Sequence, residues 1–362
     1  MRTTIRGTVV AGAVAAVVAC GVAVSLATAG GDPSPERSAS GLPAPDVRAR
    51  PDQSPPRDRI AAGRVALSAY FTSRSVRQPK GDGAVAYEWS LLDTTTGRYR
   101  KTDWAWLDVA PGMKTAAVLE RGLPADRIGL LNPATHKVER WIEVDRGVGG
   151  VRFSPDGKRL VATAYGRDPD ALGPEPSRTG FYVVDVASGR ADFTELPPRK
   201  ADRGSSARGG RQDFLWSRDS TLVWEPWANE TGKVFYDVAG KEVPAPEQEA
   251  RLGAPGALLS PDKKLVTGNF AGDDGRIVSE VLDASDGRRV ALVPGQQLLA
   301  WADDDSLIAW RCDPERCDPG KGEFRNQLVL VGLDGKSVTP LSGFRKADLH
   351  YGGRWTPVFS RR

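Results

Sequence analysis

The side chains that most often carry enzyme chemistry are scarce in this chain of 362 residues. Its two histidines are His136, in the turn Asn-Pro-Ala-Thr-His-Lys, and His350, which precedes Tyr351. Both are poorly placed for a catalytic triad, in which a histidine must meet a hydroxyl and a carboxylate. The sequence also contains no G-x-S-x-G, H-E-x-x-H or P-loop motif. We therefore predict no catalytic residue and no cofactor.

Carboxylates and thiols give two further places where a metal could bind. The acidic run 303–305 replaces Pro-Asp-Gly in a turn, which already explains it, and the run 273–274 lacks the alternate spacing of a calcium loop. Cys312 and Cys317 have four residues between them and no histidine nearby. This spacing favours a short-range disulfide over a metal centre. We predict a Cys312–Cys317 disulfide and no metal site.

Basic and aromatic side chains give the strongest candidate for binding. Trp227 lies just beyond Pro226, and a Gly- and Ser-rich stretch before it carries five basic residues: Arg199, Lys200, Arg203, Arg208 and Arg211. Tryptophan and arginine are enriched at the centres of protein interfaces. Such a loop would suit an acidic protein surface or an anionic cell-wall polymer. The alternative is a solvated loop beside tryptophans that pack within their own sheet, which we expect for Trp224.

Two recurring hairpins must position these residues. The first is typified by GGVRFSPDGKRLVATAYG, in which Pro, Asp and Gly suit a tight turn between two apolar strands. Related turns lie within residues 106–118, 214–224, 257–266 and 299–308. The second hairpin is an apolar run that ends in Asp or Asn before a turn, and it lies at residues 91–99, 131–139, 183–192, 235–243, 281–290 and 331–338. The spacing, roughly 40 to 53 residues, is typical of four-stranded propeller blades.

The number of hairpins indicates how the chain closes. We call hairpins of the first type inner hairpins and those of the second type outer hairpins. The sequence contains six outer hairpins but only five complete inner ones. Residues 65–71 form one strand without an inner partner, and residues 354–360 look like the missing innermost strand. We therefore predict an all-β fold, a β-propeller of six blades (alternatively seven) that is closed by its C-terminal strand. Closure removes the unpaired sheet edges that invite aggregation.

The FSPDGKRL…FYVVDVASG pattern resembles the TolB-type, WD40-like propeller repeat of bacterial envelope proteins. The resemblance covers roughly residues 60–360 and is sharpest at residues 149–190. It implies a propeller fold. The propellers of that family serve as protein-binding platforms or as lids on peptidase domains, but the repeat motif itself concerns the fold only.

The two faces of such a propeller differ in their loops. The short, regular turns described above lie on one face, which we call the turn face. The long, irregular segments all fall on the opposite face, the insertion face, and comprise residues 72–84, 166–180, 198–212, 225–233 and 310–326. Loops that elaborate one face of a repeat scaffold often carry binding. We therefore place the candidate binding residues on the insertion face, with merely tolerated insertions as the alternative.

The N-terminus carries an export signal. Arg2 and Arg6 precede the uncharged, apolar residues 8–29, which are long enough to span a membrane and would leave the propeller outside the cytoplasm. Two alternatives are a signal peptide cleaved after the Ala-Thr-Ala sequence at 27–29 and a lipoprotein with Cys20 as its lipidated residue.

The predicted organisation has three parts. Residues 1–29 are the anchor or signal segment, residues 30–59 are a disordered linker rich in Pro, Ser, Gly and charge, and residues 60–362 are the propeller. A net charge of +4 without a concentrated basic stripe argues against nucleic acid.

We thus predict a monomeric, membrane-tethered, extracytoplasmic propeller that binds an envelope or secreted protein or an anionic cell-wall polymer. A secreted protein or a lipoprotein is the alternative for its location. For its function, the alternative is an extracytoplasmic hydrolase or lyase, whose titratable residues would converge on the insertion face or in the central channel.

Overall fold

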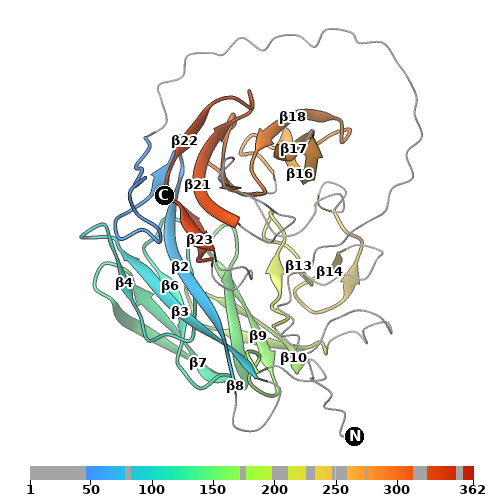
Figure 1. Ribbon diagram of the computed structural model, residues 1–362. Coiled ribbons are helices and arrows are strands. Elements are labelled where there is room, and N and C mark those ends of the chain that lie inside the picture. The colour runs from blue at the N-terminus through green and yellow to red at the C-terminus, as the bar shows by residue number, and fades with distance from the viewer. Residues whose placement is uncertain are drawn as a thin grey trace, which may run out of the picture.

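The computed structural model describes residues 46–77, 83–171, 177–197, 211–225, 233–246, 249, 259–273, 276–312, 324–347 and 354–362. Every element assigned within these residues is a β-strand, which confirms the all-β prediction for this part of the chain (Figure 1). The first eight strands are β1 (Ala61–Ala62), β2 (Val65–Val76), β3 (Ala84–Asp93), β4 (Arg98–Lys101), β5 (Trp106–Val109), β6 (Ala116–Leu119), β7 (Ala125–Asn132) and β8 (Lys137–Phe153).

The next eight strands are β9 (Arg159–Tyr165), β10 (Arg178–Asp185), β11 (Ala191–Glu195), β12 (Leu215–Trp216), β13 (Val223–Glu225), β14 (Val234–Tyr236), β15 (Glu242–Val243) and β16 (Leu265–Asp273). The last eight are β17 (Arg276–Asp283), β18 (Arg289–Pro294), β19 (Gln297–Trp301), β20 (Ser306–Cys312), β21 (Phe324–Gly332), β22 (Val338–Pro340), β23 (Arg345–Ala347) and β24 (Thr356–Arg361).

Antiparallel pairing groups the described strands into five sheets that follow one another around a common centre, a propeller-like arrangement (Figure 1). The first sheet has the order β1-β2-β3-β4, with β24 also paired to β2, and the second is the seven-stranded sheet β5 to β11. The remaining sheets are β12 to β15, β16 to β18, and β19 to β22 with β23 on β21.

The described strands do not form the six or seven separate sheets that the sequence led us to expect. The reason is β8, which has 17 residues and serves two neighbours. Its first part pairs with β7, from Asn132↔Lys137 to Arg127↔Glu143, and its last part pairs with β9, up to Phe153↔Leu160. An outer strand therefore continues without a loop into the next inner strand, and two hairpin repeats share one sheet.

The C-terminal strand closes the ring as predicted. β24 pairs antiparallel with β2 in a register that runs from Val65↔Arg361 to Phe71↔Thr356. The two ends of the described chain therefore complete one sheet, with β24 as its innermost strand. This pairing satisfies the backbone of β2 along an edge that would otherwise be open.

Three of the inner hairpin turns share one hydrogen-bonding pattern. In the Ser-Pro-Asp-Gly turn, Ser154 Oγ donates to Asp156 Oδ1 at 2.5 Å and accepts from the backbone N of Arg159 at 3.0 Å. The turns at 217–220 and 260–263 repeat this pattern, with a serine–aspartate distance of 2.6 Å in each. The sequence S-x-D thus builds the turn from its own side chains.

The outer hairpin turns use a similar local device. Asp185 Oδ1 accepts from the backbone N of Ser188 at 2.7 Å and holds the turn between β10 and β11. The equivalent acceptors in the other five hairpins are Asp93, Asn132, Asp237, Asp283 and Asp334. Short polar side chains at these positions explain why the hairpin could be recognised from sequence.

Tryptophans supply much of the buried volume between the sheets. Trp89, Trp310 and Trp355 are among the largest fully buried side chains. Trp224 is also buried, and its Nε1 donates to the backbone O of Trp216 at 3.0 Å within the same sheet. It therefore packs in its own sheet, as expected.

The described fold begins earlier than the predicted boundary at residue 60. Residues 46–59, which we assigned to the disordered linker, lie against the first and last sheets. Arg48 forms a bridge with Ala61, and Arg50 forms one with Ser342. The composition of residues 46–59 predicts a solvated backbone, but in the structure this backbone has hydrogen-bond partners in the folded domain.

Residues 8–29 lie outside the described residues. Within the described part, no helix is long and apolar enough to cross a membrane.

Candidate functional site

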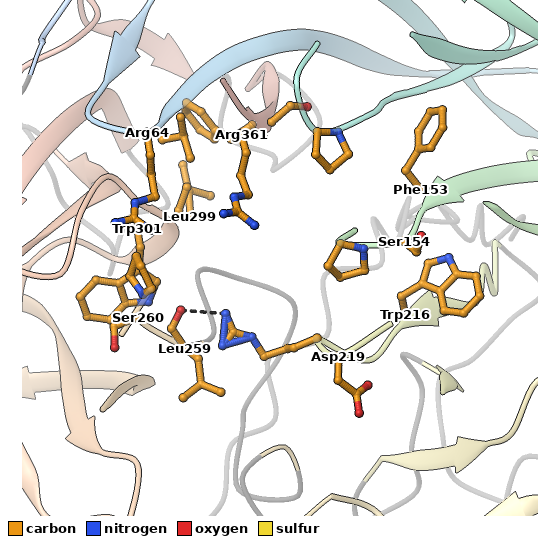
Figure 2. A pocket seen from close by; sticks show the side chains of 18 of the residues that line it. Arg64, Phe153, Ser154, Trp216, Asp219, Leu259, Ser260, Leu299, Trp301 and Arg361 are labelled. Carbon is orange, nitrogen blue, oxygen red and sulfur yellow. Dashed lines mark hydrogen bonds between the residues drawn. The ribbon is translucent and has the colours of Figure 1, made fainter. Parts of the chain in front are cut away.

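A cavity lies at the centre of the ring (Figure 2). This axial cavity has a volume of about 620 Å³. Four of the five sheets and the turn that precedes β16 line it, mostly through the ends of innermost strands and the turns that follow them: Val65, Asp108, Val109, Phe153, Ser154, Trp216, Asp219, Leu259, Ser260, Leu299, Trp301, Phe359 and Arg361. It therefore lies at the turn face of the ring.

Four cationic side chains line the axial cavity: Arg64, Arg218, Lys263 and Arg361. Figure 2 shows Arg64 and Arg361 extending from neighbouring positions towards the interior, which follows from the register Val65↔Arg361. Arg64, Lys263 and Arg361 are exposed, and within the described residues none of the three has an ion pair. Arg218 is half-buried and donates to the backbone O of Leu259 at 2.9 Å. Burial lowers the pKa of Arg218.

The carboxylates of the cavity are held by other groups. Asp108 accepts from the backbone N of Phe153 at 2.8 Å and from Arg152 at 3.2 Å, so it links two inner strands. Asp219 accepts from the Ser217 hydroxyl at 2.6 Å within its turn. Glu249 accepts from the backbone N of Arg218 at 2.9 Å, and burial raises its pKa. These bonds leave the cations as the groups free to meet a ligand.

The hydroxyls of the cavity are engaged in the same way. Ser154 and Ser260 bond the aspartates of their own turns, and Ser360 donates to the backbone O of Val109 at 2.9 Å. A nucleophile needs a neighbouring base that is free to take its proton. Among the described lining residues, these serines stabilise turns and strands, and none of them is paired with a free base.

Apolar side chains form the walls between the charged groups. Leu299 and Trp301 lie on the side of Arg64, and Phe153 and Trp216 lie across the cavity (Figure 2). The Nε1 of Trp216 donates to the backbone O of Arg152 at 3.1 Å, which fixes its ring. Apolar walls with a few polar groups are typical of ligand sites, and a low-dielectric wall strengthens the field of a nearby charge.

Most of the predicted binding residues lie in segments outside the described part of the chain. Arg199, Lys200, Arg203, Arg208 and Trp227 lie outside the described residues, as do Cys20, Cys317 and His350. Cys312 is buried at the end of β20, and its pairing with Cys317 stays a prediction.

Arg211 is described, and it is an interior residue. Its side chain is only 10% exposed, binds Asp170 through two nitrogens at 2.5 and 2.9 Å, and lies 3.4 Å from Asp213. Its guanidinium stacks on the ring of Trp106 at 3.6 Å. Burial lowers the pKa of Arg211, but Asp213 and Asp170 outweigh that effect and raise it. Arg211 therefore joins secondary elements within the fold, and it is not a free member of the basic loop.

His136, in the outer turn that begins at Asn132, is largely covered. Its Nε2 lies 3.8 Å from Asp93 Oδ2 of the neighbouring outer turn, and burial lowers its pKa. A neutral imidazole between two turns fits a structural role.

Sequence reasoning missed the axial cavity because the inner turns were interpreted as scaffold. The available signal was weak: Arg64 follows a glycine just before the first long strand, and Arg361 ends the closing strand. Only the pairing of β24 with β2 brings these two arginines together.

The fold and the cavity define an all-β, propeller-like protein with a cationic axial cavity at its turn face. No protein-family model matches the sequence, and no curated protein sequence matches it. Among solved structures, the chain is similar to TolB from Acinetobacter baumannii, with a TM-score of 0.44 and 14% identity over 81% of this chain and 66% of that one. It is also similar to the Kuenenia stuttgartiensis hydrazine synthase, with a TM-score of 0.35 and 13% identity over 66% of this chain and 65% of that one. The chain spans just under two thirds of each. Likeness at this level concerns the fold alone.

Proposed function

We propose that this protein is an extracytoplasmic binding module that takes an acidic segment of an envelope or secreted protein into its axial cavity. The observation that carries the proposal is the set of cavity cations without a carboxylate partner among the described residues, Arg64, Lys263 and Arg361. These three side chains can each donate charge-assisted hydrogen bonds to an anionic group of a ligand.

The size of the cavity agrees with this proposal. About 620 Å³ is enough for a few residues of an extended peptide or for a small ligand, within the ~300–1,000 Å³ range of binding pockets. The apolar side chains of Leu299 and Trp301 lie beside Arg64, so an acidic side chain and an apolar one could bind side by side. An anionic cell-wall polymer would meet the cations but would leave the apolar wall unused.

Three further features belong to the same proposal. The seven-stranded sheet comprises two blades that share β8, which gives six blades in accord with the six outer hairpins. Residues 8–29 anchor the protein in the membrane and place the propeller outside the cytoplasm. The basic residues 199–208 with Trp227 form a second contact surface on the insertion face.

The test measures binding of a fluorescein-labelled poly-glutamate peptide by fluorescence anisotropy. The variant Arg64→Glu/Arg361→Glu reverses two cavity charges. The matched control Lys137→Glu/Lys336→Glu makes the same change in net charge at two exposed outer turns. We expect the cavity variant to lose roughly tenfold or more in affinity and the control to stay near wild type, because local charge decides the contact. Added salt should weaken wild-type binding.

Two outcomes would contradict the proposal. Equal losses in the cavity variant and the control would show that only net charge matters. A loss confined to a third variant, Arg203→Glu/Arg208→Glu/Trp227→Ala, would move the site to the insertion face. In-cell crosslinking with the same variants then identifies the natural partner.

A further inference from the structure

The N-terminal strap, residues 46–60, crosses the seam at which the ring closes. At this seam the first sheet, which contains β24, faces the last sheet of β19 to β23. The strap contacts both. Its apolar residues Val47 and Ala49 pack on the core cluster that Ile60, Trp310 and Trp355 share across the seam.

On the last sheet, the strap is bound through its backbone. Arg50 N donates to Leu341 O at 2.8 Å, and Gly343 N donates to Gln53 O at 2.7 Å. These two bonds bracket a parallel bridge between Arg50 and Ser342. The strap thus adds a short extended segment beyond β22. Beside it, Trp355 Nε1 donates to Ser54 Oγ at 3.2 Å, so the residue that leads into β24 is also bound.

On the first sheet, the strap follows the outer turn between β3 and β4. Arg59 N donates to Gly97 O at 2.8 Å, and Tyr99 N donates to Arg57 O at 2.9 Å. Asp58 lies 3.7 Å from the Arg98 guanidinium. The strap is therefore fixed to the outer edge of the first sheet as well as to the last sheet.

Gln53 holds the bend between these two halves. It is 8% exposed, and its Oε1 accepts from the backbone N of Arg57 at 2.8 Å and of Asp58 at 3.1 Å. Its Nε2 donates to Asp58 Oδ2 at 2.9 Å. A buried amide with all these partners gives the strap one conformation.

The outermost contact joins the strap to the C-terminal residue. Arg362 NH1 donates to Asp46 Oδ2 at 2.9 Å, and the same guanidinium donates to Gly63 O. Arg362 N donates to Arg64 O at 2.9 Å. The end of β24, the start of β2 and the start of the strap are thus tied at one point.

We propose that the N-terminal strap is a clasp that keeps the ring closed. Apart from the strap, the described seam depends on the pairing of β24 with β2, on the apolar contacts of one core cluster, and on two hydrogen bonds to the last sheet, from Arg64 N to Ala302 O at 2.9 Å and from Arg354 to Gln297 Oε1 at 3.0 Å. Local opening of a protein begins where few bonds oppose it. The strap adds bonds to both sides of the seam, so the sheets part only after the strap has left. Because residues 1–45 lead directly into the strap, a membrane tether would hold the propeller at this seam. The inference is independent of the proposed ligand.

Hydrogen exchange of the full chain in detergent micelles tests the clasp. The release variant is Asp46→Ala/Gln53→Ala/Arg362→Ala, and a second variant lacks residues 46–53. The matched controls are Glu120→Ala/Arg127→Ala, which breaks an ion pair of 2.7 Å in the second sheet, and a deletion of the eight residues 38–45.

We expect the amides of β24 to exchange about tenfold faster or more in both strap variants. The amides of β9 and β10 should stay as in wild type, and both controls should leave β24 unchanged. The variant without residues 46–53 lacks the residues that bind the last sheet, Arg50 and Gln53 among them. If the amides of β24 exchange in this variant as slowly as in wild type, the proposal is wrong. If that variant does not fold, unchanged β24 protection in the release variant would have the same force.

Discussion

The buried ion pair between β10 and β13 gives the sharpest test of how this fold is stabilised. Arg178 and Glu225 are 1% and 5% exposed, and their side chains meet at 2.7 Å. Tyr236 OH donates to the same Glu225 oxygen at 2.9 Å, and the guanidinium lies 4.3 Å from the Phe214 ring centre. The pair thus links two sheets of the ring in a site without water contact.

The expected effect follows from what each substitution leaves behind. Glu225→Gln removes the negative charge and keeps the shape, so the Arg178 cation stays buried without a counter-charge. Breaking a buried pair in this way costs about 3–5 kcal/mol of the free energy of unfolding. The double variant Arg178→Met/Glu225→Leu removes both charges, and we expect it to lose far less, because an apolar replacement of a buried pair is often neutral.

Thermal unfolding monitored by circular dichroism provides the measurement. Glu225→Gln should lower the midpoint by roughly 5–10 °C for a domain of this size, with the double variant close to wild type. The matched control is Glu120→Gln, which breaks an ion pair of the same length, 2.7 Å, whose side chains are 38% and 40% exposed. We expect little change there, because water screens exposed pairs. Equal effects at Glu225 and Glu120 would refute the reasoning, and so would a double variant less stable than Glu225→Gln.

Three further predictions concern the backbone and pH. Gly63→Ala should destabilise the protein strongly, because φ is +52° and the new Cβ would lie 2.2 Å from Ala302 O, whereas Gly97→Ala, with φ +71° and no atom within 4 Å, should cost much less in the same thermal assay. Burial lowers the pKa of Lys233 from 10.5 to about 8, so the unfolded chain holds this proton more tightly than the folded protein does. The free energy of unfolding should therefore rise between pH 8 and pH 10.5 relative to that of Lys233→Met. Parallel pH profiles of the two proteins would contradict this. A backbone hydrogen bond holds the pKa of Asp185 below 3.8, so its contribution is present above that pH and is lost as the pH falls through the folded value; Asp185→Asn should unfold with a flatter acid profile.

The sequence predicted those parts of the fold that depend on neighbours along the chain. A serine, an aspartate and a left-handed residue within four positions build three of the inner turns, and an aspartate or asparagine before a left-handed residue builds outer turns such as those at Asp185 and Asn132. Closure by the C-terminal strand was also predictable, because one hairpin lacked its inner strand. The count of separate sheets was not, because β8 continues from one repeat into the next without a turn residue to mark the change.

Only the tertiary structure decided which charged and polar residues are free. Arg211 belongs to a basic stretch by composition, but Asp170 and Trp106 from distant strands bury it. Residues 46–59 have the composition of a linker, but their backbone groups find partners near residue 342 and in the Arg362 side chain, about 300 positions away. Local sequence sets the dihedral angles of a turn. Burial depends on what the closed ring brings together, and no window of neighbouring residues contains that information.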